Sequence, residues 1–114
     1  MEALAARELI AQNPRWYHSI EVTPGVVTPG LIDLRPIAPR VLPGALNGRR
    51  ALDVGTFDGF WAFELERRGA ETVAIDVGAA EEAEWPPLAR VRLRAEAEAM
   101  GLELGQGFRL AAES

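Results

Sequence analysis

Two glycines, Gly55 and Gly59, bracket a short turn between a strand-like and a helix-like segment in "LDVGTFDGFWAFELERRGAETVAID". A helix N-terminus offers unpaired N–H groups and a partial positive charge, and glycine lets a ligand approach the backbone closely. The next strand-like segment ends at Asp76, 17 residues beyond Gly59 (76 − 59), near the interval of about 20 at which an acid accepts hydrogen bonds from a ribose. The spacing therefore predicts a nucleoside-binding turn. Its residues are Gly55, Thr56, Phe57, Asp58 and Gly59.

The turn departs from the dinucleotide fingerprint G-x-G-x-x-G, because Phe57 stands where that fingerprint has its middle glycine. A bulky residue there argues against a pyrophosphate pressed onto the backbone. Asp53, at the end of the preceding strand, would repel phosphate but attract an ammonium group, directly or through water. A ligand with adenosine at one end and an amino acid at the other fits these charges better than NAD. S-adenosylmethionine is a ligand of that kind, and an NAD-binding module is the disfavoured alternative.

These residues also resemble a known family. "LDVGTFDG" resembles motif I of the class I S-adenosylmethionine-dependent methyltransferases, and "VAIDV" resembles motif II. "RWYHSIEVTPGVVTPG", followed by "LDVGTFDGFWAFELERRGA", is similar to a branch related to the tRNA wobble-uridine (5-hydroxyuridine) methyl or carboxymethyl transferases. The resemblance covers most of residues 14 to 114, and the Phe57 departure is shared with that branch. It implies that the cofactor's methionine part is surrounded by Asp53, Gly55, Thr56 and Gly59, and its ribose by Asp76.

Asp58 and the segment Trp16, Tyr17 and His18 are further candidates with two interpretations each. Asp58 is interpreted as the N-cap of the following helix, with a ligand contact as the alternative. His18 is the only histidine of the chain, which makes it a candidate base. Methyl transfer from a sulfonium needs mainly proximity and alignment, so a base is optional. Tyr17 or His18 is interpreted either as a contact to cofactor or substrate or as a hydrogen-bonded residue with a structural role.

The segment before the turn is expected to be a helical and looped extension. Residues 2–12 are strong helix formers, and Thr-Pro-Gly occurs at 23–25 and again at 28–30. Pro-Gly favours a type II turn in which the glycine takes a positive φ, so an ordered, turning loop is predicted. The helix is expected to present one face made of Leu4, Ala5, Glu8, Leu9 and Gln12.

The complete pattern predicts an α/β chain. An extension over residues 1–48 precedes a partial Rossmann-like, S-adenosylmethionine-binding domain over 49–114, of which the first βαβ unit is present. The resemblance implies that this is the N-terminal half of a class I methyltransferase fold. The expected elements of this second part are a strand at 51–54, a helix at 59–68, a strand at 71–76, a helix within 88–100 and a further helix near 107–114.

Composition excludes several classes of site. The chain has no cysteine, which excludes disulfides and thiolate chemistry, and its single histidine disfavours a zinc site, so no metal is expected. All twelve basic residues are arginine and the formal net charge is −5. An acidic chain is poorly suited to gripping nucleic acid over its whole surface, although a local arginine patch stays open. With no apolar run long enough for a bilayer, a soluble cytoplasmic protein without a membrane partner is expected.

Two functions are predicted from different classes. The first is S-adenosylmethionine-dependent methyl or carboxymethyl transfer, to a tRNA uridine or a small molecule. The second is a truncated, catalytically inactive methyltransferase-like module that binds a nucleoside or a partner chain. Two parallel strands flanked by helices would leave a hydrophobic sheet edge bare. The expectation is therefore a homodimer, a complementary C-terminal half that covers this edge, or an unstable fragment.

Overall fold

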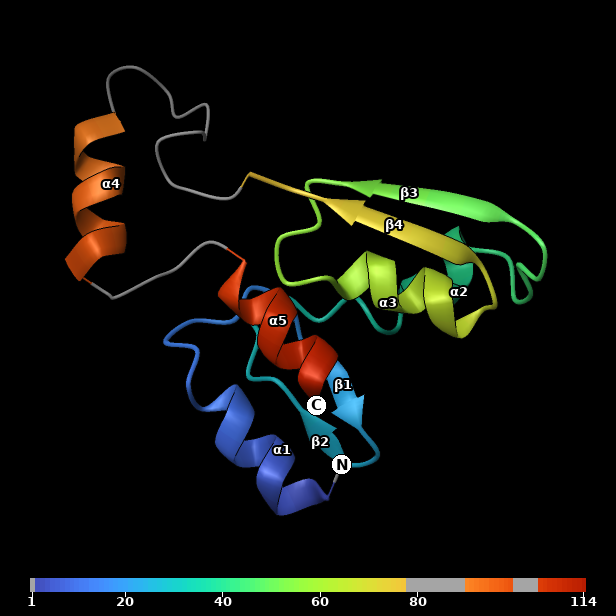
Figure 1. Ribbon diagram of the computed structural model, residues 1–114, viewed down its shortest axis with the longest axis horizontal. Helices are drawn as coiled ribbons and strands as arrows, with labels where there is room; N and C mark the ends of the chain where they lie inside the picture. Colours follow the sequence, from blue (N-terminus) through green and yellow to red (C-terminus); the bar gives the residue numbers. More distant parts are fainter. Residues whose placement is uncertain (1, 78–89, 100–104) are drawn as a thin grey trace.

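The computed structural model describes residues 2–77, 90–99 and 105–114 (Figure 1). These residues form a small α/β arrangement with two separate two-stranded sheets, and neither sheet is closed. The predicted α/β class is thereby confirmed. In chain order the elements are α1 (Ala3–Ile10), β1 (Glu21–Thr23), β2 (Val26–Val27), α2 (Ala38–Val41), β3 (Arg50–Val54), α3 (Phe60–Arg67), β4 (Glu71–Ile75), α4 (Arg90–Ala99) and α5 (Gln106–Glu113).

The β3–α3–β4 unit is the part of the fold that follows local sequence rules most closely. β3 and β4 pair in parallel, and α3 connects them and packs against both strands. Figure 1 shows the two strands side by side with α3 running along them. The strand predicted at 51–54, the helix at 59–68 and the strand at 71–76 are each confirmed to within one residue at either end. Gly69, at φ +95, ends the helix as a left-handed glycine does.

The predicted face of the N-terminal helix is confirmed only at Leu9, which packs against the core. Leu4, expected in that face, is 70% exposed, whereas Ala6 and Ile10 are the buried residues of α1. The helix contacts α5 and the β1–β2 hairpin. Ala6 is fully buried there, and so small a side chain lets the helix approach its neighbours closely. Packing against these distant elements therefore selects a different stripe from the one with the largest side chains.

The two Thr-Pro-Gly sequences adopt different structures. The first turns the β1–β2 hairpin, and Gly25 takes the predicted positive φ of +78. The second does not, because Gly30 has no positive φ. Its glycine instead allows two chain segments to approach: a Cβ at Gly30 would lie 2.1 Å from the carbonyl carbon of His18. His18 forms a parallel bridge with Ile32, and the N–H of Ser19 donates to the Ile32 carbonyl at 2.9 Å.

The extension and the βαβ unit share one hydrophobic core. The indole of Trp16 is 2% exposed, and its N–H donates to the carbonyl of Ile10 at 2.9 Å, at the end of α1. α5 closes this core from the C-terminal side through Leu110 and Ala111. The buried members of the core are Ala6, Ile10, Trp16, Ile20, Val26, Ala38, Phe60, Leu110 and Ala111.

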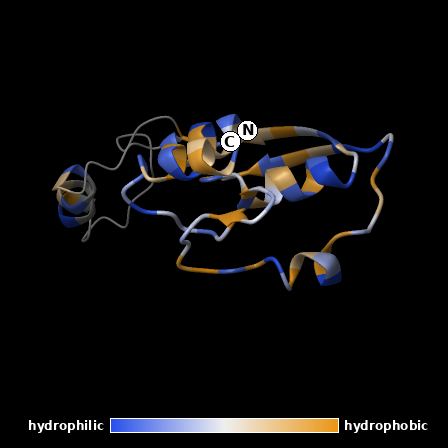
Figure 2. Cartoon of the chain, turned by 90° about the horizontal axis from the view of Figure 1, so that it is seen from below, coloured by the Kyte–Doolittle hydropathy of each residue, from blue (hydrophilic) through white to orange (hydrophobic). Residues whose placement is uncertain are grey.

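Both predicted C-terminal helices are confirmed as α4 and α5, although residues 88, 89 and 100 of the first prediction lie outside the described residues. In Figures 1 and 2 α4 lies apart from the other elements. Its Arg92 and Glu96 form an exposed ion pair at 3.7 Å. Within the described ranges, every helix is too short or too polar to cross a lipid bilayer.

Candidate functional site

The glycine turn follows the carboxyl end of β3 and is tied to the carboxyl end of β4. Three of its residues have positive φ: Gly55 at +76, Phe57 at +53 and Gly59 at +94. The N–H groups of Gly55 and Thr56 both donate to the carbonyl of Ile75, at 2.9 and 3.2 Å. Because the last residue of β4 accepts both bonds, the turn and the residue after β4 are held side by side.

Asp76 lies against this turn, as its place in the sequence predicts. One carboxylate oxygen accepts the N–H of Phe57 at 2.7 Å, and the other accepts the N–H of Val77 at 2.7 Å. The side chain is exposed. Since each carboxylate oxygen has a further acceptor position, Asp76 can still accept hydroxyl donors from a ligand while it holds the turn.

Two buried oxygens at the turn have no hydrogen-bond partner. They are Oδ2 of Asp53 and Oγ1 of Thr56, and Thr56 as a whole is 8% exposed. Leaving a buried polar atom unpaired costs about 1–3 kcal/mol. Gly55 lies between these two residues in the sequence, and no atom lies within 4 Å of the position that a Cβ on Gly55 would occupy. The turn therefore combines unsatisfied acceptors with an open approach to its backbone.

Asp58 has a different role from the predicted one. α3 begins from Gly59 as N-cap with no side-chain cap, so the N-cap interpretation is wrong. Asp58 is 1% exposed and points to the N-terminal loop. Its Oδ2 accepts the N–H groups of Tyr17 and His18, at 3.2 and 2.8 Å, and its Oδ1 lies 2.5 Å from Nδ1 of His18. The buried donors of the loop require an acceptor, and this carboxylate supplies it.

The Trp-Tyr-His segment contributes one exposed side chain to the neighbourhood of the turn. Trp16 belongs to the core, and His18 is 8% exposed, with its ring stacked on Phe60 at 5.4 Å. Tyr17 is 43% exposed and meets the ring of Phe57 edge-on at 5.9 Å. Phe57 is itself 39% exposed. The rings of Tyr17 and Phe57 therefore border the turn at the surface. His18 is buried and hydrogen-bonded, as its structural interpretation predicts.

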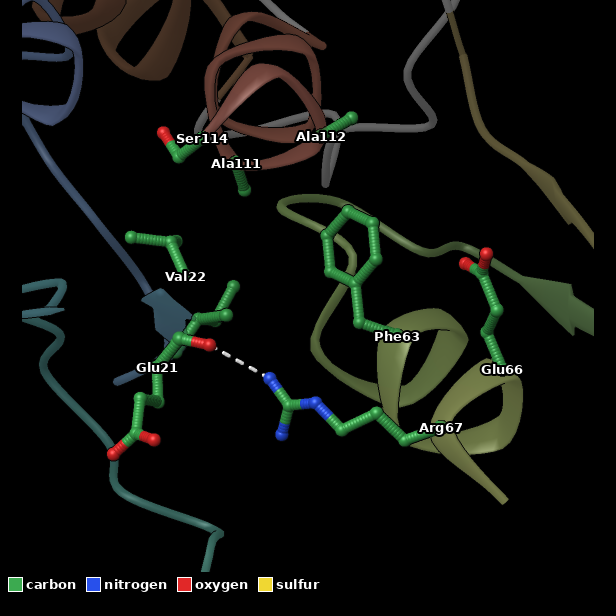
Figure 3. Close-up of a pocket in the computed structure, with 9 residues that line it drawn as sticks. Glu21, Val22, Phe63, Glu66, Arg67, Ala111, Ala112 and Ser114 are labelled. Atoms are coloured by element: carbon green, nitrogen blue, oxygen red, sulfur yellow. Dashed lines mark hydrogen bonds between the residues drawn. The ribbon is translucent and has the colours of Figure 1, made fainter. Parts of the chain in front are cut away.

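A pocket of about 530 Å³ lies between β1, α3 and α5. Figure 3 shows Val22, Phe63 and Ala111 around it, with Arg67 at its edge. That guanidinium donates to the carbonyl of Glu21 at 2.7 Å and is therefore already engaged. The pocket contains none of the predicted site residues. Among the described side chains, no cluster of three or more histidine or acidic residues is placed to hold a metal ion.

No protein-family model, curated protein or solved structure matches the chain. The function is therefore argued from the chemistry of the glycine turn and its surroundings.

Proposed function

We propose that the glycine turn and Asp76 bind S-adenosylmethionine, and that this chain provides the donor site of a methyl or carboxymethyl transfer. The observation that carries the proposal is the pair of buried, unpaired oxygens on Asp53 and Thr56 beside the open backbone of Gly55. A carboxylate and a hydroxyl suit the ammonium of the cofactor's amino-acid end, which is an N–H donor and a cation. In this proposal β3–α3–β4 is the first unit of a Rossmann-like methyltransferase fold.

The adenosine end fits the other side of the turn. Asp76 accepts the ribose hydroxyls at its free acceptor positions while it keeps its bond to the Phe57 N–H. The exposed rings of Phe57 and Tyr17 offer apolar surface to a planar base. Each part of the ligand therefore meets a group of matching chemistry.

The bound cofactor supplies an electrophilic carbon on a sulfonium. The residues of this chain bind and orient it, and catalysis consists of holding donor and acceptor in line. No general base is required of His18 in this mechanism. A tRNA uridine is the acceptor that the resemblance suggests, and a small molecule is the other candidate.

A second candidate function is a module that binds the nucleoside or a partner chain without turnover. It is favoured by the bare face of the β3–β4 sheet, where Leu52 and Val54 are 61% and 70% exposed. Binding and turnover separate the two candidates. Methyl transfer from labelled cofactor to tRNA or to a small-molecule mixture is expected only under the first.

Calorimetric titration of the chain with S-adenosylmethionine tests the site directly. An Asp76→Ala variant is expected to bind at least about tenfold more weakly, because it loses the ribose acceptor. Asp33→Ala is the matched control, since Asp33 is an exposed aspartate whose carboxylate is hydrogen-bonded to Arg35. A folded chain that binds no S-adenosylmethionine would refute the proposal, and tighter binding of NAD would favour the dinucleotide alternative.

A further inference from the structure

The β3–β4 sheet has one covered face and one bare face. Side chains alternate between the two faces along each strand, and α3 packs against one of them. The apolar residues of the other face are exposed: Leu52 by 61%, Val54 by 70%, Val73 by 57% and Ile75 by 48%. Parallel sheets are normally covered on both faces. Contiguous exposed apolar surface of this kind is typical of interaction sites.

The bare face also carries two opposite charges at one end. The register pairs Arg50 with Glu71, and the apolar pairs follow as Leu52 with Val73 and Val54 with Ile75. Both charged residues are exposed. Neither forms an ion pair with another residue of the described chain. One strand thus presents a cation and the other an anion at the same level of the sheet.

We propose that this face binds the same face of a second copy of the chain, about a two-fold axis parallel to the strands. That rotation places β3 of one copy over β4 of the other. Arg50 then meets Glu71 of the second copy twice, and the apolar rows of the two sheets meet across the usual spacing of about 10 Å. The face is complementary to itself in both charge and hydrophobicity, which is the requirement of an isologous interface.

The other two-fold stacking of the same faces is unfavourable. With the axis across the strands, Arg50 would lie over Val54 of the second copy, and Glu71 would lie over Ile75. Both charges would then face apolar side chains of the second copy, and no ion pair would form between the two chains. The parallel arrangement is therefore selected by electrostatics. It brings all four carboxyl strand ends, and both glycine turns, to one end of the dimer.

The small size of the face sets the strength of the dimer. Five-residue strands give a patch only about 16 Å long, which falls short of the usual interface of about 800 Å² per partner. We therefore expect reversible dimerisation in the micromolar range or weaker. This inference does not rest on cofactor binding, and its failure would leave the titration with S-adenosylmethionine unaffected.

Charge reversal across the proposed axis tests the arrangement by sedimentation over a range of chain concentrations. Arg50→Glu and Glu71→Arg are each expected to weaken self-association at least about tenfold, because each places like charges opposite one another. An equimolar mixture of the two variants is expected to form a one-to-one heterodimer, since every opposed pair is then of opposite sign. The double variant Arg50→Glu/Glu71→Arg is expected to dimerise by itself. Arg40→Glu, an exposed reversal in α2, is the control and should dimerise like the parent chain.

Far-UV circular dichroism confirms that each variant keeps its fold before sedimentation is interpreted. A parent chain that stays monomeric at every concentration would overturn the proposal. So would a dimer that persists unchanged in the single variants, or a mixture of the two that fails to associate.

Discussion

Removing the carboxylate of Asp58 tests how the N-terminal loop is held to the glycine turn. Asp58→Ala leaves the N–H groups of Tyr17 and His18 and the ring Nδ1 of His18 without their acceptor in a buried place. Each unsatisfied buried donor costs about 1–3 kcal/mol. With two backbone donors and one ring partner affected, the free energy of unfolding should fall by about 3–5 kcal/mol.

Asp58→Asn separates shape from charge. Its remaining oxygen can accept the two backbone N–H groups, and its NH₂ group can donate to Nδ1 of His18 in the other tautomer. Only the charge assistance of the hydrogen bonds is then lost, which corresponds to about 1–2 kcal/mol. The expected order of destabilisation is therefore alanine well above asparagine.

Urea unfolding followed by tryptophan fluorescence measures both changes, because Trp16 is buried in the core beside this loop. Asp33→Ala is the control: its carboxylate is exposed and pairs with Arg35 at 2.7 Å, so its loss should destabilise the chain far less than the loss of the buried Asp58 carboxylate. If Asp58→Ala costs no more than this control, the buried carboxylate does not hold the loop. A double-mutant cycle of Asp58→Ala with His18→Ala then isolates the ring contact from the backbone contacts.

Three further outcomes are expected. Gly30→Ala should lower the free energy of unfolding by about 3 kcal/mol or more, because the new Cβ would lie 2.1 Å from the backbone carbonyl carbon of His18. Gly44→Ala is the control and should change it by less than about 1 kcal/mol, because no atom lies within 4 Å of its new Cβ. Thr56→Val should raise the stability of the chain in urea, because it removes an unpaired buried hydroxyl. The same variant should bind S-adenosylmethionine more weakly in calorimetry. A variant that loses both stability and binding, or that loses neither, contradicts the proposed role of Thr56. The Arg35 side chain and backbone N–H lower the pKa of Asp33 from 3.8 to about 2. The stability that the ionised Asp33 carboxylate contributes is therefore present above pH 3.8 and is lost as the pH falls toward 2. NMR titration of the carboxyl group measures this pKa, and Arg35→Gln should return it toward 3.8.

The elements that the sequence predicted correctly are those whose signals are local. The short apolar runs of β3 and β4, and the glycines at the two ends of α3, lie within a few residues of the structure they specify. Asp76 was placed correctly because parallel strands align their carboxyl ends, so the residue after one strand meets the turn after the other. The rule needs no knowledge of the remaining chain.

The predictions that failed depend on contacts between distant segments. Asp58 stands at a position where an N-cap is locally reasonable, yet its partners Tyr17 and His18 lie 41 and 40 residues away. The close approach at Gly30, and the selection of Ala6 and Ile10 in α1, likewise follow from neighbours that no local window contains.

The conformation of Phe57 links these contacts to function. A non-glycine residue at φ +53 is strained, and such strain persists only where the surroundings fix it. Here the Phe57 N–H is held by Asp76 at 2.7 Å, and the next residue, Asp58, is anchored to the loop of His18. Glycine would take this φ without strain, so shape alone does not require phenylalanine. The ring is instead displayed at the surface beside Tyr17, where it would border the cofactor in the proposed site.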